Sequence, residues 1–478
     1  MNRTGIFLGA AGVLALVALV VGLPRATGTT TPPVANPPPT IVTPPPSTTN
    51  SNGSLTITTR LSHPFVMVGS TDVFVTADVK AVDVPGQTRS PVNLALVIDR
   101  SGSMSGFKLN QAKQAARQLV GQLRSEDRLT IVHYGSDVKA MEGIYATTEN
   151  RDRLLAYIDG IWDDGGTNIG AGLTTGRDLL LKAKHDFKVN RIVLISDGQP
   201  TEGITDHASL VNIVREVRQA GISVSSIGVG TDFNEQLMES FAEVGAGAYA
   251  YLQDAAQLEQ IFAKDLNAAS TQVARNVTIT VKVPAGSRLV RTLGYTPIAR
   301  SMSGSEELVT LALPDFAAGT TERVVLQLSV DGTTNGQTLD VSQLTLAYTD
   351  LLASQPVTTN AFVRASVTTD TTIVQQKQDG EALVFAARAQ AGANTQAAVD
   401  ALRRGDRAEA KQLFEANKRI INGSGAVQGA PSVAKDLAEQ EQLINDLDSA
   451  NDEGSINAYS KQARKKARLD FGLFGSTY

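Results

Sequence analysis

Apolar positions in the middle of the chain follow two different periods. Continuous apolar runs predict buried strands near residues 93–98, 128–134, 138–144, 191–196, 222–229 and 248–252. Between the first two runs, Leu109, Ala112, Ala116 and Leu119 recur close to the helical period. Repeated strand–helix units of this kind predict a doubly wound α/β domain over residues 91–268, with a mostly parallel sheet covered by helices on both faces.

The segments on either side of this domain alternate with a period of two. Leu55 and Ile57 alternate with threonines in residues 54–90, and the same alternation runs through residues 269–369 without a helical interruption. The second segment is therefore expected to form an antiparallel β-sandwich. Because residues 54–90 are too short for a domain, we predict that their strands join this sandwich. The α/β domain would then be inserted into, or flanked by, the sandwich.

Residues 370–478 form a polar C-terminal region with a helical period. Apolar residues from Ala398 to Phe414 lie on both sides of a Gly405-Asp406 turn, which predicts a helical hairpin packed on the body of the protein. One tetratricopeptide-like helix pair is the alternative. Further along, basic residues favour a solvated helix face over a contact with anionic lipid or a partner; they are Lys461, Arg464, Lys465, Lys466 and Arg468.

The first 53 residues contain no pattern of a folded domain. Residues 1–23 have a basic start followed by an uncharged, mostly apolar stretch whose length borders on that of a spanning helix. Pro24 lies two residues before Ala26, a poor fit to a cleavage site, so an uncleaved membrane anchor is favoured over a cleaved signal segment. Residues 24–53 are expected to be a Pro/Thr-rich linker. Either alternative places the remainder of the chain outside the cytoplasm. An uncleaved segment would anchor it in the cell envelope, and a cleaved one would leave it secreted or periplasmic.

Composition excludes several classes of function. The 478 residues carry a net charge of −5, which argues against a nucleic-acid binder, and contain no cysteine for disulfides, thiolate metal sites or nucleophiles. None of the four histidines has the spacing of a zinc site, and no nucleophile elbow or phosphate loop is present. His133 lies in an apolar strand and is expected to be a core residue. We therefore expect the chain not to be an enzyme.

Oxygen-bearing side chains gather where the predicted strands end. Asp99, Ser101 and Ser103 follow the strand 93–98 directly, Thr167 follows a Gly-Gly turn, and Asp197 follows the strand 191–196. Carboxylate and hydroxyl oxygens are suitable ligands for a hard cation such as Mg²⁺. Ligands of doubly wound sheets bind beyond the carboxyl ends of the strands. The sequence therefore predicts that Asp99 and Asp197 line one crevice.

In this order and spacing, the three segments resemble the metal-ion-dependent adhesion site of von Willebrand factor type A domains. Asp99, Ser101 and Ser103 match the first motif, Thr167 the second and Asp197 the third. Arg100 and Gly102 fall at its variable positions. The resemblance covers residues 90–268, and the whole chain resembles bacterial A-domain proteins related to inter-alpha-trypsin inhibitor heavy chains.

The resemblance implies a divalent cation, Mg²⁺ or alternatively Mn²⁺ or Ca²⁺. Ser101 and Ser103 would contribute hydroxyls directly, Thr167 directly or through water, and Asp99 and Asp197 mainly through water. The cation would then bind an Asp or Glu carboxylate of a protein partner. Candidate rim residues for that partner are Trp162, Asp164 and Gly166. A segment near residues 258–266 would be the one that shifts between affinity states.

Three other interpretations stay open. The module could be a structural scaffold of a cell-envelope assembly, in which the cation only stabilises the fold. Less favoured is a chaperone-like partner of a cytosolic ATPase, because the apolar N-terminus and the Pro-rich linker argue against it. The serines of the first motif could also merely cap helices in a vestigial site.

Overall fold

The computed structural model describes residues 47–84, 89–230, 233–252, 264, 267–268, 271–423 and 431–472. The predicted anchor at residues 1–23, most of the predicted linker and most of the segment 258–266 lie outside these residues. No helix in the described part of the chain is both long and apolar enough to cross a membrane.

A six-stranded sheet forms the centre of the α/β domain. Its strand order is β10-β9-β8-β5-β6-β7, and every neighbouring pair is parallel except the antiparallel pair β6–β7 at the edge. The mostly parallel sheet predicted from the apolar runs is therefore confirmed. The strands are β5 (Val92–Asp99), β6 (Arg128–Tyr134), β7 (Val138–Tyr145), β8 (Val189–Ser196), β9 (Ser223–Val229) and β10 (Ala246–Leu252).

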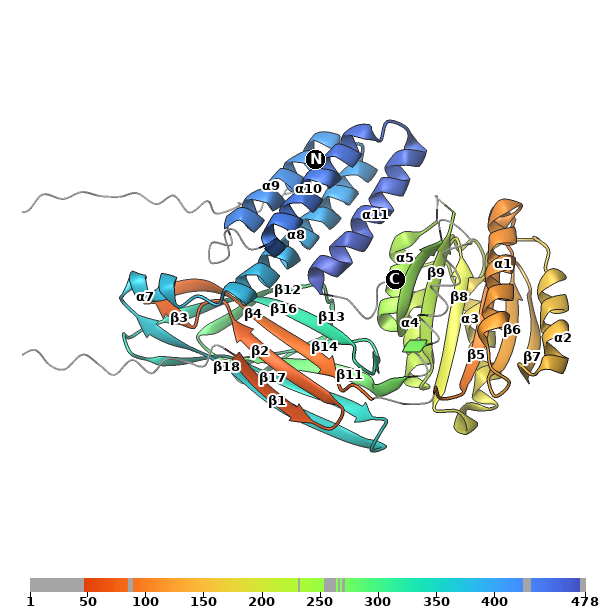
Figure 1. Cartoon of the computed structure of the whole chain (residues 1–478), viewed down its shortest axis with the longest axis horizontal. Coiled ribbons are helices and arrows are strands. Elements are labelled where there is room, and N and C mark those ends of the chain that lie inside the picture. The colour runs from red at the N-terminus through yellow and green to blue at the C-terminus, as the bar shows by residue number, and fades with distance from the viewer. Residues whose placement is uncertain are drawn as a thin grey trace, which may run out of the picture. The chain divides into compact units, whose positions relative to one another are not determined.

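Helices cover both faces of this sheet (Figure 1). Leu94 and Leu96 of β5 point into one hydrophobic cluster with α1 and α2, while Ala95 and Val97 point into another with α3, α4 and α5. Because successive strand residues point to opposite faces, a strand buried on both sides has no polar alternation, which explains its continuous apolar run. The helices are α1 (Phe107–Gln122), α2 (Thr148–Asp159), α3 (Ile169–Leu181), α4 (His207–Gln219) and α5 (Glu235–Val244).

Two mainly antiparallel sheets form the β-rich part. The five-stranded sheet has the order β1-β2-β4-β16-β12. The seven-stranded sheet has the order β13-β14-β11-β17-β18-β3, and its seventh strand, β15, pairs with β11 beside this path. Before the α/β domain come β1 (Ser47–Asn52), β2 (Leu55–Leu61), β3 (Phe65–Met67) and β4 (Gly69–Ala81). After it come β11 (Gln272–Val283), β12 (Ser287–Leu293), β13 (Pro297–Ser303), β14 (Glu306–Ala312), β15 (Phe316–Ala317), β16 (Thr321–Gly332), β17 (Thr338–Asp350) and β18 (Gln355–Thr368).

The insertion predicted from the sequence is confirmed in part by strand pairing. β4 pairs with β16 along its length, from Lys80 opposite Thr321 to Gly69 opposite Gly332, and β3 pairs with β18. Apolar side chains of both sheets, such as Val75 and Ile279, belong to one hydrophobic cluster. Strands from both sides of the α/β domain therefore share a single core.

The predicted linker extends too far at its C-terminal end. Residues 47–52 form β1, which pairs antiparallel with β2 through a turn at Gly53. Gly53 has φ +65°, a left-handed conformation that glycine adopts without strain. The threonines of this stretch face threonines of β2, as in the hydrogen bond between Thr49 and Thr58. Threonine is suited to a strand as well as to a spacer, so composition alone misplaced the boundary.

The C-terminal region is helical, and α8 to α11 lie side by side (Figure 1). A buried cluster that includes Leu402, Phe414 and Leu447 joins these helices. The turn at Gly405 connects α8 to α9, where the sequence predicted a hairpin. The helices are α7 (Thr371–Gln376), α8 (Gly380–Arg403), α9 (Arg407–Gly423), α10 (Pro431–Ser449) and α11 (Glu453–Phe471).

The interpretation of the basic residues of α11 as a solvated face is wrong for Lys461, Arg464 and Arg468, which are buried, whereas Lys465 is exposed. Lys461 and Arg464 are 6% and 7% exposed. Lys461 Nζ donates to the carbonyl of Gly230, and the guanidinium of Arg464 lies 3.4 Å from the buried carboxylate of Glu235. A charge run in a sequence does not reveal a buried acceptor more than two hundred residues away, so the solvated face was the wrong choice for these buried residues.

Candidate metal centre

Strand register brings Asp99 to the centre of the sheet's carboxyl edge. Asp99 is the last residue of β5 and lies opposite Tyr134 of β6, while on the other side Ile98 pairs with Ile195 of β8. Ser196 therefore lies beside Asp99, and Asp197 begins the next loop. The chain leaves β5 toward β6 on one side and later returns to β8 on the other, so this edge is a topological switch point.

The carboxylate of Asp99 is fully buried and hydrogen-bonded on both oxygens. Oδ1 accepts the backbone N–H of Ser101 at 2.9 Å, and Oδ2 accepts the hydroxyls of Ser196 at 2.6 Å and Tyr134 at 3.3 Å. Burial, and to a smaller extent the nearby charge of Asp197, raise the pKa of Asp99 to about 6, although the hydrogen bonds from Ser101 and Ser196 lower it. The two carboxylates are close enough to repel each other, an arrangement that a cation between them would stabilise.

The two serines of the first motif point their hydroxyls toward each other. Ser101 Oγ and Ser103 Oγ are 3.1 Å apart; Ser101 is 1% exposed, while Ser103 lies at the surface. The backbone N–H of Gly102 donates to the carbonyl of Gly165 at 3.0 Å, which holds the first loop against the second. Gly165 has φ +76°, and a Cβ there would come within 2.6 Å of Ser136 Oγ, so this close approach requires glycine.

Thr167 connects the second loop to the third. Its N–H donates to Thr201 Oγ1 at 2.9 Å, and its carbonyl accepts the N–H groups of Thr201 and Glu202. Thr167 itself is 2% exposed. All three predicted loops are thus joined by hydrogen bonds, although the first and the third lie about a hundred residues apart in the chain.

Asp197 has a buried carboxylate oxygen that the described part of the protein leaves unsatisfied at this site. The residue is 1% exposed, and its Oδ2 accepts a hydrogen bond from Lys108 Nζ at 3.1 Å. Its Oδ1 is buried and has no hydrogen-bond partner among the described residues. A buried carboxylate oxygen without a partner is costly, and a metal ion or its bound water would satisfy it.

The donor set fits Mg²⁺ or a similar hard cation. It consists of two carboxylates and the hydroxyls of Ser101, Ser103 and Thr167, all oxygen. No group of three or more His, Asp or Glu side chains that could hold a metal occurs in the described ranges. The donor set described above differs from such groups because hydroxyls make up most of it.

The predicted rim residues lie in the second loop. Trp162 is 62% exposed, and Lys139 Nζ lies 5.1 Å from the centre of its ring. The Asp164 side chain is 63% exposed, and Gly166 N–H donates to Ser136 Oγ. Ser136 in turn donates to Glu202. Ser136 and Glu202 belong to no recognisable motif, so the sequence alone does not reveal them as part of this loop cluster.

Arg100 has a structural role, although it falls at a variable position of the motif. Its side chain is 1% exposed and among the largest fully buried ones in the described chain. NH1 donates to the carbonyl of Asp164 at 3.2 Å, NH2 pairs with Asp137, and the backbone carbonyl accepts the N–H of Asp164. Arg100 thereby fastens the first loop to the second and to the turn between β6 and β7.

His133 is a core residue, as predicted. It is 7% exposed, and its ring packs edge-on against Tyr157 at 5.6 Å. Its Nδ1 has no hydrogen-bond partner within the described part of the chain. Burial, together with the charges of Arg100 and Lys139, lowers the pKa of His133 to about 4.

The buried histidine makes stability depend on pH. Below the ordinary histidine pKa of about 6.5 the unfolded chain takes up a proton that the folded chain excludes until about pH 4. His133→Phe keeps the aromatic contact but removes the titrating group. We expect its free energy of unfolding, relative to that of the parent, to be about 1–2 kcal/mol higher at pH 5 than at pH 7.5, with partial solvent screening taken into account. Urea unfolding of both proteins at the two pH values measures this, and an equal difference at both would contradict it.

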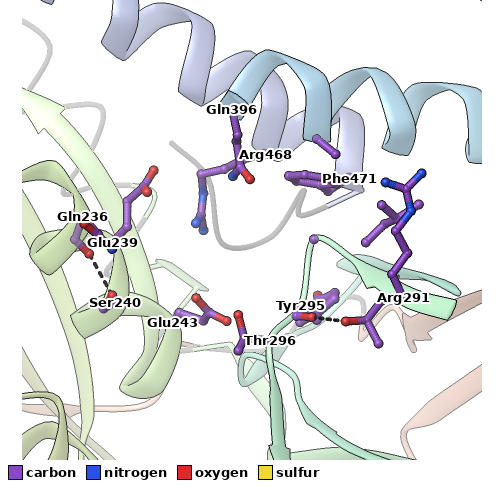
Figure 2. A pocket seen from close by; sticks show the side chains of 14 residues that line it. Gln236, Glu239, Ser240, Glu243, Arg291, Tyr295, Thr296, Gln396, Arg468 and Phe471 are labelled. Carbon is purple, nitrogen blue, oxygen red and sulfur yellow. Dashed lines mark hydrogen bonds between the residues drawn. The ribbon is translucent and has the colours of Figure 1, made fainter. Parts of the chain in front are cut away.

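Another concavity, of about 390 Å³, lies among α5, the β12–β13 turn, α8 and α11. Figure 2 shows Glu239 and Glu243 of α5 on one side and Arg468 of α11 on another. None of the predicted metal ligands lines it. Because acidic and basic side chains face the same space, its charge favours no single class of ligand, and we assign it no function.

The fold and the loop geometry define a von Willebrand factor type A domain. Residues 93–264 match the family model "von Willebrand factor type A domain". The chain is 31% identical over 222 residues to the Escherichia coli K12 protein named "Uncharacterized protein YfbK". This alignment covers 46% of this chain and 38% of that protein. The chain is 30% identical over 159 residues to inter-alpha-trypsin inhibitor heavy chain H1 of Sus scrofa, covering 32% of this chain and 18% of that protein.

A solved structure extends the likeness beyond the A domain. The structure named "von Willebrand factor type A from Catenulispora acidiphila" aligns with 90% of this chain and 99% of its own, with a TM-score of 0.64 and 15% identity. At that identity the likeness concerns the fold alone. The chain spans less than two fifths of the length of either curated relative described above.

Proposed function

We propose that this chain is a metal-dependent protein-binding module. A divalent cation, Mg²⁺ or alternatively Mn²⁺ or Ca²⁺, is held by Ser101, Ser103 and Thr167, with Asp99 and Asp197 acting mainly through water. A protein partner contributes an Asp or Glu carboxylate to it. The observation that carries the proposal is the buried, unpartnered Oδ1 of Asp197 beside a second buried carboxylate.

The chemistry of the ligands supports a role in binding. When bound, the cation supplies an open coordination position for an oxygen of the partner. Hydroxyl ligands are neutral, so they compensate little of the cation's charge, and an external carboxylate is attracted to it. Ser103 lies at the surface while Ser101 is buried, so Ser103 is the proposed ligand that a partner can approach from solvent. The rim formed by Trp162, Asp164 and Gly166 would contact the partner around the carboxylate.

We also propose that the function is binding without catalysis and that it takes place outside the cytoplasm. The apolar segment in residues 1–23, as a membrane anchor, and the Pro/Thr-rich residues after it support presentation from the cell envelope. A secreted or periplasmic form is the alternative. A scaffold role, in which the cation only holds the three loops together, remains the competing function, because hydrogen bonds already join those loops around the site.

An affinity experiment separates these two functions. The full chain is immobilised, exposed to a cell-envelope extract with Mg²⁺, and washed with a chelator. A binding module releases a specific protein into the chelator wash, and changing one Asp or Glu of that protein to Asn or Gln abolishes rebinding. A scaffold in which the cation is internal gains thermal stability from Mg²⁺ but releases no such carboxylate-dependent partner, and that result would overturn the proposal.

A further inference from the structure

Lys108 occupies an unusual position beside the metal centre. It lies in the first turn of α1, which contains no acidic residue, and the N-cap residue before the helix, Gly106, provides no side-chain cap. The N-terminal end of a helix disfavours a positive charge because the backbone N–H dipoles point there. The Lys108 side chain is nevertheless only 18% exposed, and its Nζ lies 3.1 Å from Asp197 Oδ2. Asp197 supplies the compensating charge.

The same carboxylate is assigned to the cation by the proposed function. Asp197 is buried, and its other oxygen has no partner among the described residues. Without a metal, Lys108 is the positive group that contacts this carboxylate, while Asp99 adds a second negative charge nearby. A divalent ion and an ammonium group in direct contact with one carboxylate repel each other strongly at a partly buried site.

We propose that Lys108 is a built-in counter-ion that occupies the cation position of the metal centre, so that a divalent ion must displace it to bind. This inference rests on the proposed function and adds a regulatory residue to the same site. Lysine suits the role because its compact ammonium group sits on a flexible four-carbon chain, which can leave the carboxylate without moving the helix. The exchange lowers the affinity for the metal, and it keeps Asp197 paired when no metal is present.

Calorimetric titration of Mg²⁺ into the full chain tests this directly. Lys108→Met removes the charge and keeps a side chain of similar length, and we expect it to bind Mg²⁺ about tenfold more tightly, the equivalent of one charge-assisted hydrogen bond. Lys108→Arg keeps the charge and should bind no more tightly than the parent. Lys182→Met is the matched control, because Lys182 lies in the same domain and pairs with exposed Glu142. It makes the same change in net charge and should leave the affinity unchanged.

A second readout follows the lysine itself. Acetic anhydride labels exposed amines, and peptide mass spectrometry reports each lysine separately. We expect Lys108 of the parent protein to be labelled faster with Mg²⁺ than with chelator, and Lys182 to be labelled equally in both. Without metal, Lys108→Met should also unfold at a lower temperature than the parent and gain more from Mg²⁺.

The outcomes separate this inference from the function on which it rests. If Lys108→Met binds Mg²⁺ no more tightly than the parent, the displacement idea is wrong while the metal centre stands. Weaker binding would mean that Lys108 positions Asp197 for the metal, which also overturns it. If neither Mg²⁺ nor Mn²⁺ binds to the parent or to the variant, both the inference and the proposed function fail.

Discussion

Asp99→Asn should abolish Mg²⁺ binding while leaving the A domain folded. Asparagine keeps an oxygen that accepts the N–H of Ser101 and an amide group that can hydrogen-bond with Ser196 and Tyr134, but it removes the negative charge. We expect the affinity for Mg²⁺ to fall by at least about hundredfold, more than the loss usual for groups that only orient a metal ligand. Calorimetric titration of the full chain measures the loss.

The alanine variant is a less specific test of the same residue. Asp99→Ala leaves the buried hydroxyls of Ser196 and Tyr134 without their acceptor, at about 1–3 kcal/mol for each unsatisfied group, so lost binding could reflect a damaged fold. Asp163→Asn is the matched control, since it makes the same change in charge on an exposed residue of the second loop. Asp99→Asn protein that still bound Mg²⁺ with the affinity of the parent would refute the assigned site.

Arg100→Ala should destabilise the A domain by about 3 kcal/mol. The substitution removes the hydrogen bond to the Asp164 carbonyl and the pairing with Asp137, and it leaves a space in a region where the parent side chain is almost completely enclosed. Because Arg100 holds the first loop against the second, Mg²⁺ affinity should fall as well. Urea unfolding reports the first effect and titration the second.

A surface arginine provides the comparison. Arg117 of α1 pairs with Asp159 of α2, and both side chains are about half exposed. Arg117→Ala should cost less than about 1 kcal/mol and leave Mg²⁺ affinity unchanged. Similar losses for the two variants would show that Arg100 acts as an ordinary surface ion pair. Arg100→Lys should fall between them, because an ammonium group cannot reproduce the fork of the guanidinium.

The parts of the fold that depend on local pattern were predictable. The strands of the A domain were located within a few residues, because a strand buried on both faces has a continuous apolar run that few other structures share. Asp99 and Asp197 lie where two neighbouring strands end, at the same edge of a parallel sheet. They are therefore expected to lie close together whatever conformation the connecting loops adopt. That argument needs only the strand order, which the alternation of strands and helices restricts.

The parts that depend on distant contacts were not predictable. Arg100 occupies a position where the motif accepts any residue, and its burial follows from Asp137 and Asp164 far along the chain. The contact of Lys108 with Asp197 spans 89 positions. In α11, Lys461 is buried by Phe233 and Tyr251, whose rings its ammonium group covers. A sequence pattern identifies which residues are charged, but their partners follow only from tertiary structure.

The insertion of the A domain has a mechanical consequence. The chain enters the domain from β4 and leaves it toward β11, and these strands belong to different sheets. Each is an interior strand, since β4 lies between β2 and β16 and β11 lies between β14 and β17. Tension on a ligand held at the metal centre would therefore divide between both layers of the sandwich. Each of these two strands is hydrogen-bonded on both sides, so neither can be peeled away like an edge strand, and the proposed binding module would resist such tension.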